Sequence, residues 1–196
     1  SHTRGHRYSP EYTGVVLDWL ESHNRRVINN SKALILELSK SLQYKELKKV
    51  GIKVPDTVYA TNKEQLLHLG KNFPCPFLTK HNRAGRGLGI KLFHNYMSFE
   101  KHINSNNFEN SIDGITLLQK YIKSKTTTII RTEFVDSQFL YAVQVDNSEG
   151  FELCPADPCN LVGEYCPANS TGNKFMILND FSHPILDQYQ KILRNN

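Results

Sequence analysis

The chain has 196 residues, of which 39% are hydrophobic and 22% charged, a composition typical of a folded domain and not of a disordered segment. No apolar run approaches the roughly 18 residues that a membrane-spanning helix needs, and no signal-peptide pattern opens the chain, so we expect a cytoplasmic protein without a membrane partner. The net charge of +5 suits a polyanionic ligand, but the densest lysines lie along one side of a predicted helix whose other side is apolar, which favours a solvated face over a nucleic-acid partner.

Short helices dominate the prediction for the first part of the chain. Residues 10–21 predict a helix, because proline is tolerated in a first turn and apolar residues recur at helical spacing. Residues 25–29 predict a short strand. Two further helices are predicted over residues 31–38 and 39–51, each capped by its first serine, and the second ends at a glycine that suits the left-handed conformation.

The middle of the chain alternates between strands and helices. Residues 57–61 predict a strand, and Asn62 followed by Gln65 predicts the capping box of a helix. A later helix is predicted to be capped by Ser98 and to be followed by a strand at residues 115–119.

The second half of the chain predicts a sheet. Two long strands, at residues 128–135 and 138–146, flank a two-residue turn. Residues 151–173 predict a long irregular excursion, and residues 174–178 a further strand. The last predicted element is an amphipathic helix at residues 184–193, with these side chains inward: Ile185, Leu186, Tyr189, Ile192 and Leu193.

Three of the four cysteines lie in the predicted excursion. Cys154, Cys159 and Cys166 have C-x4-C-x6-C spacing, whereas zinc sites usually contain a C-x2-C pair with further ligands nearby. Free thiols are therefore favoured over a zinc site, and no metal ligands are predicted.

A glycine-rich stretch carries the chemistry of the chain. The strand over residues 77–80 ends in Lys80, and residues 90–93 alternate as a second strand, so the two predict a hairpin. Its tip contains Arg83, Gly85, Arg86, Gly87 and Gly89. Alternate glycines let backbone N–H groups turn toward an anion, and a lysine beside them can place an ammonium near phosphate oxygens.

Two common phosphate loops do not fit this stretch. A Walker loop needs Gly-Lys-Ser/Thr at the start of a helix, and a dinucleotide fold needs its glycines between a strand and a helix. The stretch thus predicts a hairpin that covers the phosphates of a nucleotide, and an ordinary glycine-rich hairpin remains the alternative.

Arg131 lies on the polar side of an alternating strand. Arg131, Glu133 and Val135 share one face, while Ile130 and its alternate neighbours share the more apolar face. Arg131 and Glu133 are therefore expected to face a polar cleft or solvent, and a surface ion pair without function is the alternative.

Four features follow one another in a specific order: Lys40 near the start of a helix, Lys80 before the glycines, Gln119-Lys-Tyr-Ile122 after an apolar strand, and Arg131 in the next strand. With Gly51-Ile-Lys-Val-Pro55-Asp-Thr57 between the two lysines, this order resembles the ATP-grasp superfamily, most closely its RimK-type peptide and amino-acid ligases. The resemblance covers roughly residues 29–145.

The resemblance implies a fold and an organisation. It implies an α+β, ATP-grasp fold in which ATP lies between two α+β lobes, with the glycine-rich β-hairpin over the nucleotide cleft and the carboxy-terminal lobe incomplete. Residues 1–30 would be the remnant of a preceding domain or linker, residues 31–118 the amino-terminal lobe, and residues 119–196 part of the carboxy-terminal lobe.

The resemblance also implies residue roles. Lys40 and Lys80 would contact phosphates, and the loop with Arg83, Gly85, Arg86, Gly87 and Gly89 would close over them. The segment from Gln119 would be the interlobe linker, where backbone groups of Lys120 and Ile122 bond the adenine edge and the region of Tyr121 forms a pocket wall. Arg131 would be a catalytic residue.

The sequence departs from the family in three respects. Lys120 replaces the usual acid of the linker, and the acid that commonly holds the ribose is absent from residues 123–125. The carboxylates and the Glu-x-Asn-type motif that hold the catalytic magnesium ions are not found before Asn196. We therefore expect the magnesium ligands to lie outside this chain, which would be truncated at both ends, and expect the chain alone to be inactive.

Two functions follow from the resemblance. The first is the ATP-binding part of an ATP-dependent ligase that joins a small-molecule or peptide carboxylate to an amine or thiol through an acylphosphate, with ATP and Mg2+ as cofactors. The alternative is a non-catalytic, regulatory nucleotide-binding domain, which the lysine at position 120 favours. A basic RNA-binding module is a third possibility, but it requires exposed aromatic residues among the basic ones, and the aromatic residues here mostly occupy core-like positions.

Overall fold

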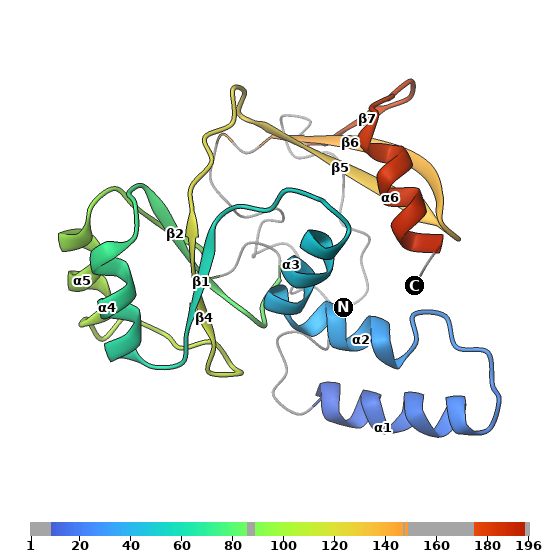
Figure 1. The fold of residues 1–196 in the computed structure, drawn as a ribbon, viewed down its shortest axis with the longest axis horizontal. Helices are drawn as coiled ribbons and strands as arrows, with labels where there is room; N and C mark the ends of the chain where they lie inside the picture. The colour runs from blue at the N-terminus through green and yellow to red at the C-terminus, as the bar shows by residue number, and fades with distance from the viewer. Residues whose placement is uncertain (1–8, 86–88, 147, 149–174, 195–196) are drawn as a thin grey trace, which may run out of the picture. The chain divides into compact units, whose positions relative to one another are not determined.

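The chain divides into two units, residues 1–122 and 123–196. The structure is a computed structural model that describes residues 9–85, 89–146, 148 and 175–194 (Figure 1). Each unit contains its own antiparallel sheet and at least one helix, so the α+β prediction is confirmed. The units separate after Ile122, which places residues 119–122 with the first unit; the predicted boundary after residue 118 stays a prediction.

The first unit is built on a four-stranded sheet. Its strands are β1 (Thr57–Ala60), β2 (Phe77–His81), β3 (Lys91–Phe93) and β4 (Thr116–Lys120). The spatial order is β1-β4-β2-β3 and each pair is antiparallel, so β4 lies in the interior of the sheet between β1 and β2. Strands β2 and β3 form the predicted hairpin.

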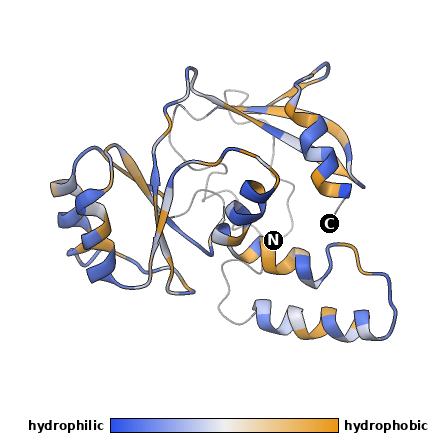
Figure 2. Ribbon diagram, viewed as in Figure 1, coloured by the Kyte–Doolittle hydropathy of each residue, from blue (hydrophilic) through white to orange (hydrophobic). Residues whose placement is uncertain are grey.

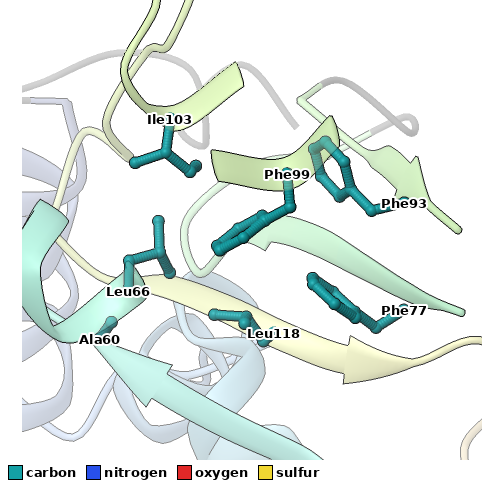
Figure 3. Close-up of a cluster of buried hydrophobic side chains, with 7 residues drawn as sticks. All are labelled: Ala60, Leu66, Phe77, Phe93, Phe99, Ile103 and Leu118. Atoms are coloured by element: carbon teal, nitrogen blue, oxygen red, sulfur yellow. The ribbon is translucent and has the colours of Figure 1, made fainter. Parts of the chain in front are cut away.

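One face of this sheet is covered by helices α4 (Lys63–Asn72) and α5 (Tyr96–Ile103) (Figure 1). The buried cluster beneath them consists of Ala60, Leu66, Phe77, Phe93, Phe99, Ile103 and Leu118 (Figure 3). Phe99 meets the rings of Phe77 and Phe93 edge-on, with centroids 5.2 and 5.3 Å away. Gly70 of α4 lets the Phe99 ring approach closely, because a Cβ at position 70 would overlap that ring.

Three helices precede the sheet: α1 (Ser9–Ser22), α2 (Ser31–Leu38) and α3 (Lys40–Lys49). The predicted strand at residues 25–29 is wrong, because this segment is irregular and Asn29 has a φ of 58°. Asn30, not Ser31, caps α2, since the Asn30 side chain accepts the Ala33 N–H at 3.1 Å. Ser31 instead donates its N–H and its hydroxyl to Glu21.

The end of α3 agrees with the prediction. Gly51 has a φ of 78°, and its N–H donates to the Lys48 carbonyl while the Ile52 N–H donates to the Leu47 carbonyl. This pair of bonds is a Schellman motif, which satisfies carbonyls at the end of the helix and turns the chain toward the sheet.

The caps of the two helices on the sheet were predicted in part. Asn62 accepts the Gln65 N–H at 2.9 Å, while the Gln65 side chain accepts from Thr61, one residue earlier than in a standard capping box. The predicted Ser98 cap of α5 is wrong. Asn95 is the cap, and Ser98 donates its N–H to the Asn95 side chain at 2.9 Å.

The second unit has a three-stranded antiparallel sheet in the order β5-β6-β7, with β5 at Thr128–Val135, β6 at Gln138–Asp146 and β7 at Phe175–Leu178. The turn between β5 and β6 has φ values of 48° and 63° at Asp136 and Ser137, as a two-residue hairpin requires. The predicted excursion at residues 151–173, with its three cysteines, lies outside the described residues.

Helix α6 (Ile185–Arg194) is the last element in the described part of this unit and contacts β6. Apolar residues recur along it (Figure 2). Leu186 is buried, and the ring of Tyr189 meets that of Phe134 edge-on at 6.1 Å. Leu193 was predicted to face inward and is 44% exposed, because it lies in the last turn of the helix.

Candidate functional site

The two faces of the first sheet have different chemistry. Residues directly opposite one another in an antiparallel pair share a face, and successive residues alternate. The register therefore places the following residues together on the face away from the phenylalanine core: Thr57, Tyr59, Leu78, Lys80, Leu117 and Gln119. We call this set the lysine face.

A row of hydrogen bonds crosses the lysine face over three strands. Lys80 of β2 donates its ammonium to the Gln119 side-chain oxygen at 2.6 Å. Gln119 of β4 donates its amide to the Thr57 hydroxyl of β1 at 2.9 Å, and Thr57 donates to the Pro55 carbonyl at 2.8 Å. Gln119 is only 2% exposed, so this row fixes the lysine from within the sheet.

Burial lowers the pKa of Lys80 from its ordinary value, because the charged ammonium loses solvation in the sheet. An ammonium has three N–H donors, and Gln119 accepts one of these bonds. A partly desolvated cation of this kind binds an anion more strongly than a solvated surface lysine does.

The glycine loop begins directly after β2. Gly89, at its far end, has a φ of 73°, and a Cβ there would lie 3.0 Å from the His81 ring, so both its conformation and its surroundings favour glycine. Gly85 lies at the near end of the loop. Arg86 and Gly87 lie outside the described residues, and the predicted phosphate contacts of the loop stay predictions.

The structure places Lys40 against the backbone at the start of this loop. Its ammonium donates to the carbonyl oxygens of His81 at 2.9 Å, Asn82 at 3.2 Å and Ala84 at 2.6 Å. The predicted phosphate contact of Lys40 is not tested by these bonds.

A buried polar cluster adjoins Lys40. Asn82 is 3% exposed; it accepts the Ser41 N–H at 2.9 Å and donates to the Asp113 carboxylate at 2.7 Å. Ser111 donates its hydroxyl to the same carboxylate at 2.5 Å. Sequence reasoning missed Asn82, Ser111 and Asp113, because polar residues so far apart in sequence carry no spacing signal.

Arg83 is directed toward the first helix. Its side chain is 10% exposed, and its guanidinium lies 3.6 Å from the Glu11 carboxylate of α1. The predicted role of Arg83 over phosphates stays a prediction, while the structure connects the start of the glycine loop to residues 9–22.

The linker segment continues β4. The Lys120 N–H donates to the Asp56 carbonyl at 2.9 Å and the Tyr121 N–H to the Pro76 carbonyl at 3.1 Å. A depression of about 470 Å³ lies here, lined by Lys53, Val54, Pro55, Asp56, Lys120, Tyr121 and Ile122. Because the Lys120 N–H is engaged, the predicted adenine contacts depend on the Lys120 carbonyl and the Ile122 N–H.

Arg131 lies in β5 of the second unit. Its guanidinium donates to the Glu133 carboxylate at 3.1 Å, and both side chains are at least 40% exposed. The predicted ion pair is present, and the catalytic role of Arg131 stays a prediction.

Among the described residues, no three histidine, cysteine, aspartate or glutamate side chains lie close enough together to hold a metal ion. Within the same residues, every helix is too short or too polar to cross a bilayer.

The sequence profile of the RimK-like ATP-grasp domain matches residues 38–152. This match covers α3, the whole sheet of the first unit, the linker, and β5 and β6. No curated protein matches the chain.

Solved structures share the fold at low sequence identity. The D-alanine-D-alanine ligase of Helicobacter pylori has a TM-score of 0.56 and 20% identity, with 92% of this chain and 52% of that chain covered. The RimK domain ATP-grasp protein of Sphaerobacter thermophilus has a TM-score of 0.53 and 16% identity, with 74% and 55% covered. The ATP-grasp ligase PsnB, in complex with its minimal precursor, Mg and ADP, has a TM-score of 0.57 and 14% identity, with 96% and 51% covered. This chain spans about half the length of these neighbours.

Proposed function

Because the chain belongs to the RimK-like ATP-grasp domain family, we propose that it is the ATP-binding part of an ATP-dependent ligase. The observation that supports this most directly is the row of Lys80, Gln119 and Thr57, which holds a partly desolvated ammonium on the lysine face against Gln119, the first residue of the linker. The PsnB neighbour, whose complex contains Mg and ADP, supports ATP as the nucleotide.

The chain offers groups for the phosphates and the adenine of ATP. Lys80 would bind phosphate oxygens, and N–H groups of the glycine loop would join it. The Lys120 carbonyl would accept from the adenine amino group, and the Ile122 N–H would donate to a ring nitrogen. Protein groups of this kind orient a triphosphate and neutralise its charge before transfer.

The proposed reaction is the activation of a carboxylate. ATP would supply the phosphoryl group, so that a carboxylate oxygen is phosphorylated and ADP leaves; an amine or thiol then attacks the acyl carbon and phosphate leaves. The named ligases among the neighbours act on an amino acid or are solved with a precursor, which supports a small-molecule or peptide carboxylate. Arg131 as a catalytic residue, magnesium as a second cofactor and a cytoplasmic location belong to the same proposal.

A regulatory domain that binds ATP without turnover is the second candidate. Lys120 favours this candidate, because the family carries an acid at this position of the linker. The Lys120 ammonium lies 4.0 Å from the Asp56 carboxylate. A cation there changes how the linker meets a nucleotide.

The test is ATP binding by calorimetry, with and without magnesium, in the protein and in Lys80→Met. Lys101→Met, an exposed lysine of α5, is the matched control. We expect Lys80→Met to weaken ATP about 10- to 100-fold, as the loss of a charge-assisted hydrogen bond predicts, and the control to change nothing.

Either result is informative. If neither the protein nor the control binds ATP, the nucleotide assignment is wrong. If ATP binds, but a protein extended beyond residue 196 forms no ADP with any mixture of amino acids, peptides and amine or thiol acceptors, the regulatory candidate replaces the ligase.

A further inference from the structure

We propose that Lys40 and Asn82 are positioning residues that shape the start of the glycine loop before any nucleotide arrives. This inference rests on the proposed function for its purpose, but not for its evidence. Hydrogen bonds of these two residues join the start of α3, the residues after β2 and the segment before β4.

Lys40 gathers backbone carbonyls around one cation. The carbonyl oxygens of His81, Asn82 and Ala84 converge on its ammonium within 3.2 Å, matching the three N–H donors that a lysine carries. Converging carbonyls repel one another, so a cation between them stabilises the turn that brings them together. Lys40 thereby fixes the direction in which the chain leaves β2.

Asn82 joins three segments of the chain. Its backbone N–H donates to the Ile115 carbonyl at 3.0 Å, and its backbone oxygen accepts from the Lys40 N–H at 3.3 Å. Its side-chain oxygen accepts the Ser41 N–H in the first turn of α3, and its side-chain amide donates to Asp113.

Asp113 is held in turn on its other side. Its second carboxylate oxygen accepts from the Ser111 hydroxyl at 2.5 Å and from the Ile115 N–H at 3.2 Å. The Ser111 hydroxyl also accepts the Arg83 N–H at 3.4 Å. Each member of the cluster therefore requires a particular donor or acceptor opposite it.

These bonds give Lys40 a positioning role that requires no direct phosphate contact. To reach a phosphate, the ammonium must leave three carbonyls that are partly buried and have converged on it. Each abandoned partner carries a desolvation penalty. A loop that is fixed in advance loses less conformational freedom when a ligand binds, and that gain requires no contact between Lys40 and the ligand.

The first test measures amide hydrogen exchange without nucleotide, by NMR, in the protein, in Lys40→Met and in the control Lys45→Met. Lys45 lies on the same helix and is exposed. Positioning predicts that Lys40→Met speeds exchange at the Ser41, Asn82 and Arg83 amides about tenfold or more, while the control does not. If Lys40 is only a phosphate ligand, exchange without nucleotide stays unchanged and only ATP binding weakens, which overturns the proposal.

The second test exchanges the two polar groups of the buried bond. Asn82→Asp sets a second carboxylate against Asp113, where a donor stood at 2.7 Å, so exchange should speed about tenfold or more. The double variant Asn82→Asp/Asp113→Asn returns an amide opposite a carboxylate and should restore exchange to within about threefold of the unmodified protein. A double variant as unprotected as Asn82→Asp would overturn the role of Asn82.

Both readouts are independent of ATP. If the unmodified protein fails to bind ATP while the exchange results hold, the proposed function fails and the positioning of the loop stands. If ATP binds through Lys80 and the exchange results fail, the reverse is true.

Discussion

At the scale of single residues, Lys80 loses solvation in the sheet, and the same burial strengthens its attraction for an anion. Its ammonium is partly removed from water, which lowers its pKa, and the oxygen of the buried Gln119 side chain accepts from it. The unfolded chain therefore binds this proton more tightly than the folded protein does, and the contribution of Lys80 to the free energy of unfolding rises with pH up to about 10.4. An anion at the lysine face has the opposite effect, because it favours the charged form.

We expect ATP affinity to depend on the protonation of Lys80. Only the ammonium form attracts phosphate, so affinity should fall about tenfold or more as the pH rises through the lowered pKa, below the value of about 10.4 for a free lysine. The measurement is the Kd for ATP from pH 7 to pH 10 in the protein and in Lys80→Arg, whose guanidinium stays charged. The same decline in both proteins would exclude Lys80 as the titrating group.

Some residues of the site could be predicted from the sequence, and others could not. Lys80 and Gln119 were both predicted as nucleotide-binding residues at the ends of apolar strands, and the structure joins them by a hydrogen bond. Asn82, Ser111 and Asp113 lie in short irregular segments, where neither periodicity nor spacing indicates that their side chains meet. Their partnership is created by the pairing of β2 with β4, which brings residues 82 and 115 together.

At the scale of elements, local turn chemistry decided which predictions held. The β5–β6 hairpin has the predicted bounds, because alternation on both sides leaves one place for a two-residue turn. The two helix caps that were predicted one and three residues late are asparagines, Asn30 and Asn95, whose side-chain oxygens accept the N–H three residues on. The predicted strand at residues 25–29 is wrong. A strand needs a second strand to pair with, and five residues of apolar and polar sequence do not indicate whether one lies beside them.

Gly70 is expected to control the contact between α4 and α5. Gly70→Ala adds a methyl group where the Phe99 ring lies, so we expect the free energy of unfolding to fall by about 1–2 kcal/mol, after the higher helix propensity of alanine is counted. Gly14→Ala is the control: Gly14 lies in α1 with no atom within 4 Å of an added Cβ, so this change should raise stability by up to about 1 kcal/mol. Urea unfolding of both variants measures the difference, and equal effects would contradict the close contact.

At the scale of the whole molecule, the buried core is unevenly divided. All seven members of the main hydrophobic cluster belong to the first unit. In the described part of the second unit, the buried hydrophobic residues are Ala142, Val145 and Leu186. The first unit therefore has the apolar surface that cooperative folding requires.

We expect residues 1–122 to fold alone. The fragment retains every strand of the first sheet and both helices that cover it, so it should unfold in a single cooperative urea transition with dispersed methyl resonances from Leu66, Ile103 and Leu118. A fragment of residues 123–196 should lack such a transition, since three strands and one described helix bury little. Gradual unfolding of residues 1–122 would show that its core depends on the second unit.

Strand β4 also has a mechanical consequence. It is bonded to β1 along one edge and to β2 along the other, and the pairing continues at its last residue, Lys120, and one residue beyond it, at Tyr121, through their N–H groups. The chain thus leaves the first unit from the interior of a sheet. Tension applied at Ile122 along the strand direction loads both ladders together, in shear, whereas an edge strand pulled in the same way is held by one ladder. The connection between the two units is consequently anchored by twice as many ladders as an edge strand would provide.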